Sequence, residues 1–185
     1  MVGRRLVTLA ILVVACFISL STTARKAAHR NGRAFPGDVV VGRVVSIADG
    51  DTLKVLDNAD LQHRIRLFGI DAPEKAQAFG KQSKKNLADK VFGETVRVEV
   101  VDIDRYGREV GRIYLGERFI NLEQVRDGCA WRYTTYDRHH EFDAAEAEAR
   151  TQRRGLWAAA HPTPPWEYRH ARRTEENHVN SPRRG

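Results

Sequence analysis

Five short segments rich in β-branched residues, each bounded by turn residues, constrain the fold of this chain more than any other feature. Within them apolar and polar side chains alternate, which is typical of strands with one buried face. Asp49-Gly50 is a hairpin-turn pair, and DRYG at 104–107 supplies another turn. We therefore predict strands at residues 39–48, 52–56, 63–70, 94–104 and 109–115.

Three segments have helical periodicity instead. Residues 77–92 carry an inner stripe of Phe79, Ser83, Leu87 and Val91 and end at Gly93. A short helix is predicted over 121–126, and an Asp-capped helix over 137–154 with Phe142, Ala145 and Ala149 at core spacing. Strands interrupted by one helix and followed by others predict an α+β fold: a small five-stranded OB-type β-barrel with about three packed helices.

Length and composition limit the classes of protein to consider. With 185 residues and 30% charged residues, the chain suits one soluble domain with short appendages. The chain has two cysteines, Cys16 and Cys129, and only Cys129 would remain if the N-terminal segment were removed. A single cysteine excludes a zinc cluster of cysteines and a disulfide framework. The net charge of +7 favours a polyanionic partner such as nucleic acid.

The first 24 residues have the order of a secretory signal: a basic start, an apolar run over 6–20 and small residues before Arg25. The alternative is an uncleaved membrane anchor over 6–24, a stretch that carries no charge. Both interpretations predict that the remainder is exported, either secreted or periplasmic, or held outside the cytoplasm by the anchor. After this segment we expect a basic linker at 25–37, one domain at 38–157 and a Pro/Arg-rich tail at 158–185, docked through Trp166.

Two aspartates are candidates for binding a metal ion. Asp51 lies in the Asp49–Thr52 turn, and Asp71 ends the following strand. Each also has a structural explanation, as a turn residue or as a strand terminator. If neighbouring strands bring the two carboxylates together, a hard divalent cation with oxygen ligands would relieve their repulsion.

Two arginines and a glutamate complete the candidate chemistry. Arg66 lies on the strand that leads to Asp71, and Arg108 follows the 104–107 turn. A guanidinium binds phosphate through two parallel hydrogen bonds and keeps its charge, which suits the extra negative charge of a phosphodiester transition state. Glu74 can accept a proton from an attacking water, although it also suits the start of a helix.

Four separated motifs, in this order, resemble the thermonuclease family, whose type member is staphylococcal nuclease. They are IADGDT (47–52), RLFGIDAPE (66–74), DRYGR (104–108) and RGLW (154–157). The resemblance extends from about Val39 to Trp157. It implies a nuclease that hydrolyses DNA and/or RNA with Ca²⁺ and leaves 3′-phosphate ends.

The resemblance also implies roles for individual residues. Asp51 and Asp71, with the backbone carbonyl of Ala72, match the calcium ligands, and Asp49 matches an acid close to the ion. Arg66 and Arg108 match the arginines that grip the scissile phosphate, and Glu74 matches the general base. Arg105, Tyr106 and Tyr133 match or lie near positions that contact the nucleotide.

Two alternatives from other classes remain open. A non-catalytic OB-type module would bind nucleic acid without cleaving it, and such domains typically lose the acidic and arginine set that this chain retains. A cell-surface interaction module would use the possible anchor and the basic tail. It predicts no calcium-dependent thermal shift.

Overall fold

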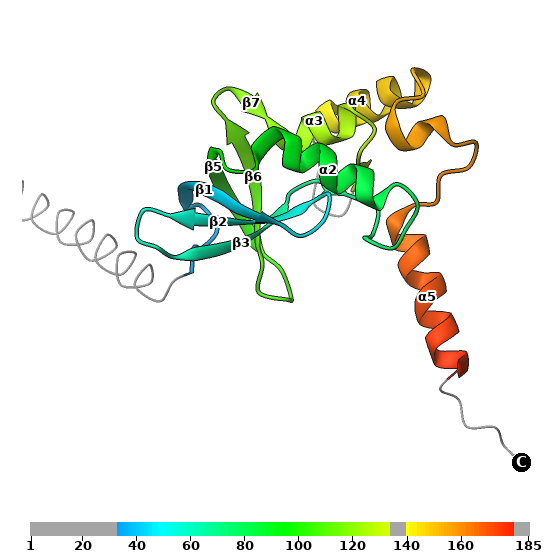
Figure 1. Cartoon of the computed structure of the whole chain (residues 1–185), viewed down its shortest axis with the longest axis horizontal. Helices are drawn as coiled ribbons and strands as arrows, with labels where there is room; N and C mark the ends of the chain where they lie inside the picture. Colours follow the sequence, from blue (N-terminus) through cyan, green and yellow to red (C-terminus); the bar gives the residue numbers. More distant parts are fainter. Residues whose placement is uncertain (1–32, 134–139, 180–185) are drawn as a thin grey trace, which may run out of the picture. The chain divides into compact units, whose positions relative to one another are not determined.

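A closed β-barrel forms the centre of the protein, for which a computed structural model describes residues 33–133 and 140–179 (Figure 1). Residues 35–185 make up one compact unit, distinct from residues 1–34. The barrel strands are β1 (Val39–Ile47), β2 (Thr52–Asp57), β3 (Gln62–Leu67), β5 (Thr95–Ile103) and β6 (Glu109–Leu115).

Strand order around the barrel is β3-β2-β1-β5-β6, with antiparallel neighbours throughout this series. A parallel pairing of β3 with β6, from Ile65 opposite Glu109 to Leu67 opposite Gly111, closes the barrel. Beside it, β7 (Arg118–Phe119) extends β6, and β4 (Ile70–Asp71) pairs with β8 (Trp131–Arg132). The predicted α+β barrel is therefore confirmed.

Alternation within the strands fills the barrel. In β5, Val96, Val98 and Val100 are buried, and in β3, Ile65 and Leu67 are buried. Each is at most 2% exposed, while the residues between them face outward or are half-buried. Since successive side chains of a strand point to opposite faces, one apolar face per strand is enough to build this core.

The helices are α2 (Gly80–Val91), α3 (Ile120–Arg126), α4 (His140–Thr151) and α5 (Pro165–Val179), with a 3₁₀ turn, η1 (Gly155–Ala158). The prediction that the first helix begins at residue 77 is wrong. Phe79 has a left-handed backbone (φ 69°), and the preceding residues form turns. The stripe of Ser83, Leu87 and Val91 is buried as predicted, whereas Phe79 packs against the Trp131 and Trp157 cluster.

The other two predicted helices occur with altered limits. α3 begins one residue earlier than predicted, and Gly128 follows it with a positive φ of 66°. In α4, Phe142, Ala145 and Ala149 are buried as predicted. The proposed cap, Asp137, lies outside the described residues.

α5 was not predicted, because residues 158–185 were interpreted as a tail. The expected docking of Trp166 does occur, since its ring centroid lies 5.6 Å from that of Trp131. Gln77 Nε2 also donates a hydrogen bond of 2.7 Å to the Thr163 carbonyl. Across the described stretches, no helix is both long and apolar enough to cross a membrane; residues 1–24 are not among them.

A buried histidine lies where β3 and β6 pair to close the barrel, and we expect it to make the free energy of unfolding depend on pH. His63 of β3 is 1% exposed, and its Nδ1 lies 3.0 Å from Glu109 Oε1 of β6. The hydrogen bond to Glu109 raises the pKa of His63 above its ordinary 6.5, against the effect of burial. Protonated His63 therefore stabilises the fold fully below pH 6.5, and this contribution is lost as the pH rises through the raised pKa.

We expect His63→Gln to lower the free energy of unfolding by about 1.5–3 kcal/mol at pH 5, as for a hydrogen bond between charged groups. The loss should shrink above the raised pKa. Urea unfolding at pH 5, 7 and 9 measures it, and His140→Gln is the control because that side chain is 99% exposed. A loss that is the same at all three pH values would contradict this account.

Candidate active site

Two aspartates from different parts of the chain meet at one end of the barrel. Asp51 lies just before β2 and Asp71 ends β4, and their exposures are 5% and 1%. Asp51 Oδ2 accepts a 2.6 Å hydrogen bond from the Ala72 amide. The Asp51 carboxylate therefore lies against the residue that follows Asp71.

Two backbone carbonyls of the turn that carries Asp51 accept hydrogen bonds from the rest of the domain. The Gly50 carbonyl accepts a hydrogen bond of 2.9 Å from Gln124 Nε2 of α3, and the Asp51 carbonyl accepts one of 2.8 Å from the Leu67 amide. Ser83 and Ala72 lie so close to Gly50 that a Cβ atom there would collide with them. Residue 50 must therefore be glycine for the turn to pack between β3 and α2.

Arg66 joins the two aspartates. It lies opposite Thr52 in the β2–β3 pairing, and its side chain is 16% exposed. Its Nη1 forms an ion pair with Asp51, and its Nη2 lies 2.8 Å from Asp71 Oδ1. Although burial favours the neutral form, Asp51 and Asp71 hold the pKa of Arg66 above its ordinary value.

Burial and neighbouring charges shift the pKa values of the carboxylates at this site. Burial and the nearby Asp51 raise the pKa of Asp49 to about 7. Burial also raises the pKa of Asp71, although Arg169 and Arg66 act against it. For Asp51, by contrast, Arg66 and the Ala72 amide outweigh burial and keep its pKa below the ordinary value. The site thus has more buried negative charge than Arg66 alone neutralises.

This donor set fits a hard divalent cation. Ca²⁺ takes carboxylate and carbonyl oxygens as ligands, and Asp51 and Asp71 bring carboxylate oxygens together around one guanidinium, with Ala72 next to them. Within residues 33–133 and 140–179, no three His, Cys, Asp or Glu side chains already surround a common point. The candidate ligands are those that the family resemblance names, the Asp51 and Asp71 carboxylates and the Ala72 carbonyl.

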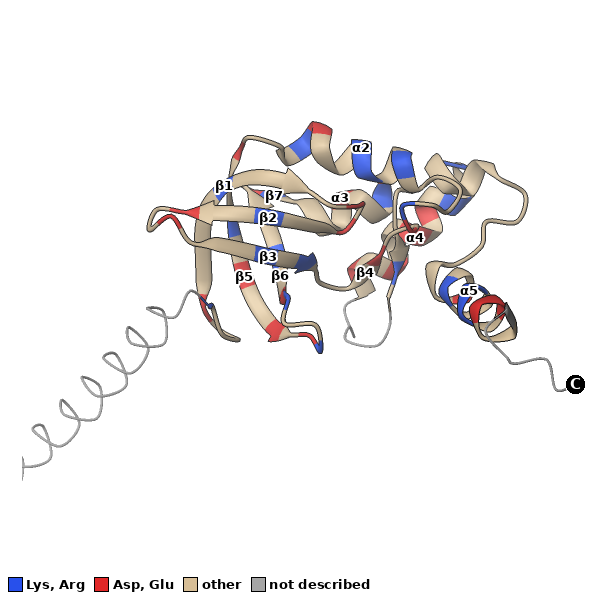
Figure 2. Cartoon of the chain, turned by 60° about the horizontal axis from the view of Figure 1, so that its bottom comes forward, with Lys and Arg blue, Asp and Glu red and all other residues tan. Residues whose placement is uncertain are grey.

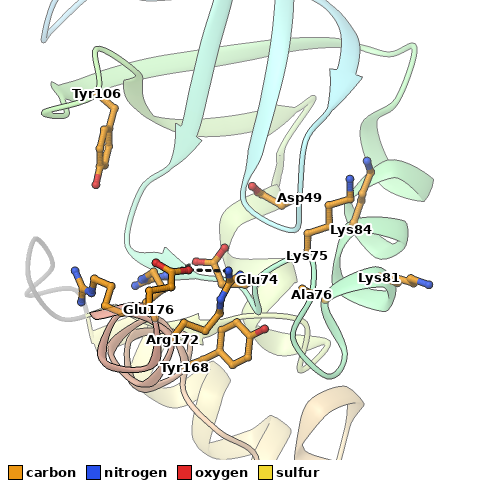
Figure 3. Close-up of a pocket in the computed structure, with 13 residues that line it drawn as sticks. Asp49, Glu74, Lys75, Ala76, Lys81, Lys84, Tyr106, Tyr168, Arg172 and Glu176 are labelled. Atoms are coloured by element: carbon orange, nitrogen blue, oxygen red, sulfur yellow. Dashed lines mark hydrogen bonds and ion pairs between the residues drawn. The ribbon is translucent and has the colours of Figure 1, made fainter. Parts of the chain in front are cut away.

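A third arginine, which the sequence analysis missed, comes from α5. Arg169 Nη2 lies 2.8 Å from Asp71 Oδ2, and Arg169 Nη1 lies 2.8 Å from Glu74 Oε1. Glu74 itself is 39% exposed and lines the cavity shown in Figure 3. The signal that could have revealed α5 is the helical spacing of Tyr168, Arg169, Arg172 and Arg173.

Arg108 reaches the site from the turn between β5 and β6. Its Nε lies 2.6 Å from Asp104 Oδ2, and its Nη1 lies 3.4 Å from Thr52 Oγ1. Thr52 in turn donates a hydrogen bond of 3.1 Å to Asp51. Arg108 is thus linked to Asp51 through Thr52, whereas Arg66 contacts Asp71 directly and Arg169 contacts Asp71 and Glu74.

The three residues expected to contact nucleotide lie farther out. Tyr106 is 65% exposed, and the Arg105 guanidinium lies 4.8 Å from its ring centroid. The Tyr133 amide donates a hydrogen bond of 2.9 Å to the Gly69 carbonyl, and the Tyr133 ring centroid lies 6.4 Å from that of Trp166. The predicted residues therefore form an inner group, Asp49, Asp51, Arg66, Asp71, Ala72 and Glu74, and an outer group, Arg105, Tyr106, Arg108 and Tyr133.

Comparisons with known proteins point to one family. A family described as "Staphylococcal nuclease homologue" matches residues 64–159. A protein of Escherichia coli named "Uncharacterized endonuclease" is 45% identical over 130 residues, which cover 70% of this chain and 84% of that protein. A "Micrococcal nuclease" of Shigella flexneri is 40% identical over 147 residues, 74% of this chain and 84% of that protein.

A plant relative is similar over a smaller share of its length. The "Probable staphylococcal-like nuclease" of Oryza sativa subsp. japonica is 47% identical over 112 residues, 60% of this chain. The match covers 34% of the rice protein, so the chain spans about a third of that relative. The family match includes Arg66, Asp71, Glu74 and Arg108, and it ends before α5.

Proposed function

The chain belongs to the staphylococcal nuclease family, and we propose from this premise that it is a calcium-dependent nuclease. It hydrolyses the phosphodiester bonds of DNA and/or RNA and leaves 3′-phosphate ends. The observation that carries the proposal is the meeting of the buried Asp51 and Asp71 on either side of Arg66, with Glu74 beside them.

The carboxylates of Asp51 and Asp71 and the Ala72 carbonyl would hold the calcium ion, and Asp49 would be the further acid near it. When bound, Ca²⁺ neutralises charge on a phosphate oxygen and orients water. The support for this assignment is chemical: the site has hard oxygen donors, and burial together with the nearby Asp51 raises the pKa of Asp49 to about 7.

Side chains around the ion supply the remaining chemistry. Glu74 accepts the proton of the attacking water. Its side chain is accessible to water because it is 39% exposed and lines the cavity. Arg66 and Arg108 bind the phosphoryl oxygens and stabilise the charge that grows in the transition state. Arg105, Tyr106 and Tyr133 hold the neighbouring nucleotides.

Digestion of denatured DNA by the purified protein tests this proposal. We expect fragments in millimolar Ca²⁺ and none in excess chelator, because the ion would neutralise charge on the phosphate oxygen and orient the attacking water. The fragments should be extended by a polymerase only after phosphatase treatment, as 3′-phosphate ends require. Equal digestion with and without chelator, or tight binding with no digestion, would contradict the proposal; the second result identifies the binding-only module.

We further propose that residues 1–24 direct export, with the nuclease domain outside the cytoplasm. The basic start and the apolar run at 6–20 support this. Mass spectrometry of the exported protein would find either a new N-terminus near Arg25 or an intact anchor. Protein confined to the cytoplasm would overturn the proposal.

A further inference from the structure

α5 lies outside the family match, which ends at residue 159, yet it borders the candidate active site. We propose that one face of α5, made of Tyr168, Arg172 and Arg173, is a second binding site for the sugar-phosphate backbone of the substrate strand. This inference rests on the proposed nuclease function and adds to it a surface for the nucleotides beyond the scissile bond.

A cavity of about 900 Å³ separates this face from α2. Six of the side chains that line it are basic, Lys75, Lys81, Lys84, Arg169, Arg172 and Arg173, against three carboxylates. Tyr106 and Tyr168 also line it, and Figure 3 shows their rings on different sides of Glu74. A basic groove with aromatic rings along it is the combination that binds a polynucleotide strand, because phosphates pair with the cations and bases stack on the rings.

The arginines of α5 lie on one side of the helix. Tyr168, Arg169, Arg172, Arg173 and Glu176 are spaced as one face of an α-helix and all line the cavity. They include every arginine of α5. Figure 2 shows the Lys and Arg positions on α2 and on α5.

The first turns of α5 are fixed to the domain, so that this face has a defined position. Arg169 pairs with Asp71 and Glu74, and Trp166 packs edge-to-face on Trp131. Arg172 and Arg173 follow Arg169 by one turn and are exposed. The Arg172–Glu176 ion pair, 3.0 Å long, is also exposed, and such pairs are worth little. A phosphate can therefore replace Glu176 as the partner of Arg172 at small cost.

Binding without catalysis gives the first test. In chelator, where no cleavage is expected, fluorescence anisotropy of a labelled 20-nucleotide single strand measures affinity at several salt concentrations. For Arg172→Gln/Arg173→Gln we expect at least tenfold weaker binding at low salt. The slope of log K against log salt should fall in magnitude by about 1.4, since each phosphate contact to a single strand contributes about 0.7.

Arg43→Gln/Arg97→Gln is the matched control. It removes the same formal charge from two exposed barrel residues that do not line the cavity. We expect its salt slope to stay within a few tenths of the original, and Arg172→Lys/Arg173→Lys to retain most of the affinity. An equal loss of affinity in the two double glutamine variants would overturn the proposal. It would also be overturned if polyglutamate displaced the labelled strand as effectively as unlabelled strand does.

Substrate length gives the second test and separates this inference from the proposed function. A dinucleotide substrate spans the scissile bond alone, so Arg172→Gln/Arg173→Gln should leave its hydrolysis in Ca²⁺ unchanged. With a 20-nucleotide strand the same variant should raise KM and leave kcat unchanged. If the original protein hydrolyses neither substrate, the proposed function fails, and the anisotropy result still decides on α5. If it hydrolyses both and the variant matches it on both, the inference about α5 is overturned.

Discussion

Replacing Arg66 by methionine is expected to lower the free energy of unfolding by about 3–5 kcal/mol, the usual loss when one partner of a buried ion pair is removed. Asp51 would then keep its buried charge without its guanidinium partner, since Arg66 is the arginine that contacts it. Asp71 would retain Arg169. Urea unfolding in chelator measures the loss, and hydrolysis should also be lost.

Arg118→Met is the matched control for this change. Arg118 also pairs with a carboxylate, with its Nη2 2.6 Å from Glu123 Oε2, but its side chain is 49% exposed. Exposed pairs contribute less than about 1 kcal/mol. Losses of similar size in the two variants would show that the Asp51–Arg66–Asp71 cluster is not the buried charge network described here.

Replacing Arg108 by alanine is expected to reduce kcat by about 10²–10³-fold, by analogy with the loss of one oxyanion-stabilising donor, about 3–4 kcal/mol. The guanidinium reaches Asp51 only through Thr52, and the carboxylate it pairs with, Asp104, is 15% exposed, against 7% for Asp51 and 1% for Asp71. The stability should therefore change much less than in Arg66→Met. Steady-state kinetics on a single-stranded substrate, with a urea melt of the same sample, measures both quantities.

Arg97→Ala is the control for Arg108→Ala. It removes an arginine that pairs with Glu99 on the barrel surface, away from the cavity. We expect its kcat to stay within twofold of the original. If Arg108→Ala lowered kcat by less than tenfold, Arg108 would not stabilise the transition state as proposed.

The barrel was predictable because its strands follow a local rule. The alternation of Val96, Val98 and Val100 with polar residues indicates both the strand and its buried face. The start of α2 was not predictable in this way. The 77–92 segment has helical periodicity, but Phe79 has a left-handed backbone, so the helix begins only after it. Phe79 also packs against the Trp131 and Trp157 cluster, a long-range contact that periodicity does not reveal.

The residues of the candidate site likewise fall into those that the sequence could predict and those that it could not. Asp51 and Arg66 lie at adjoining ends of β2 and β3, which pair, so the predicted barrel already implies that they approach one another. Asp71 does not follow in this way, because a turn at Phe68-Gly69 interrupts the strand predicted over 63–70 and places Asp71 on β4, which pairs with β8. Arg169 is 98 residues from Asp71 along the chain, and no strand pairing relates them. The spacing around Arg169 could indicate the helix, but not where it packs: the contact of Trp166 with Trp131 is long-range and has no local sequence signal.

Calorimetric titration of Ca²⁺ into the purified protein and into Asp71→Asn tests the central claim most directly, because it measures the ion without requiring hydrolysis. The account predicts one Ca²⁺ per chain in the original protein and at least tenfold weaker binding in the variant, which has lost a charged ligand. No binding in the original protein, or unchanged binding in Asp71→Asn, would contradict it.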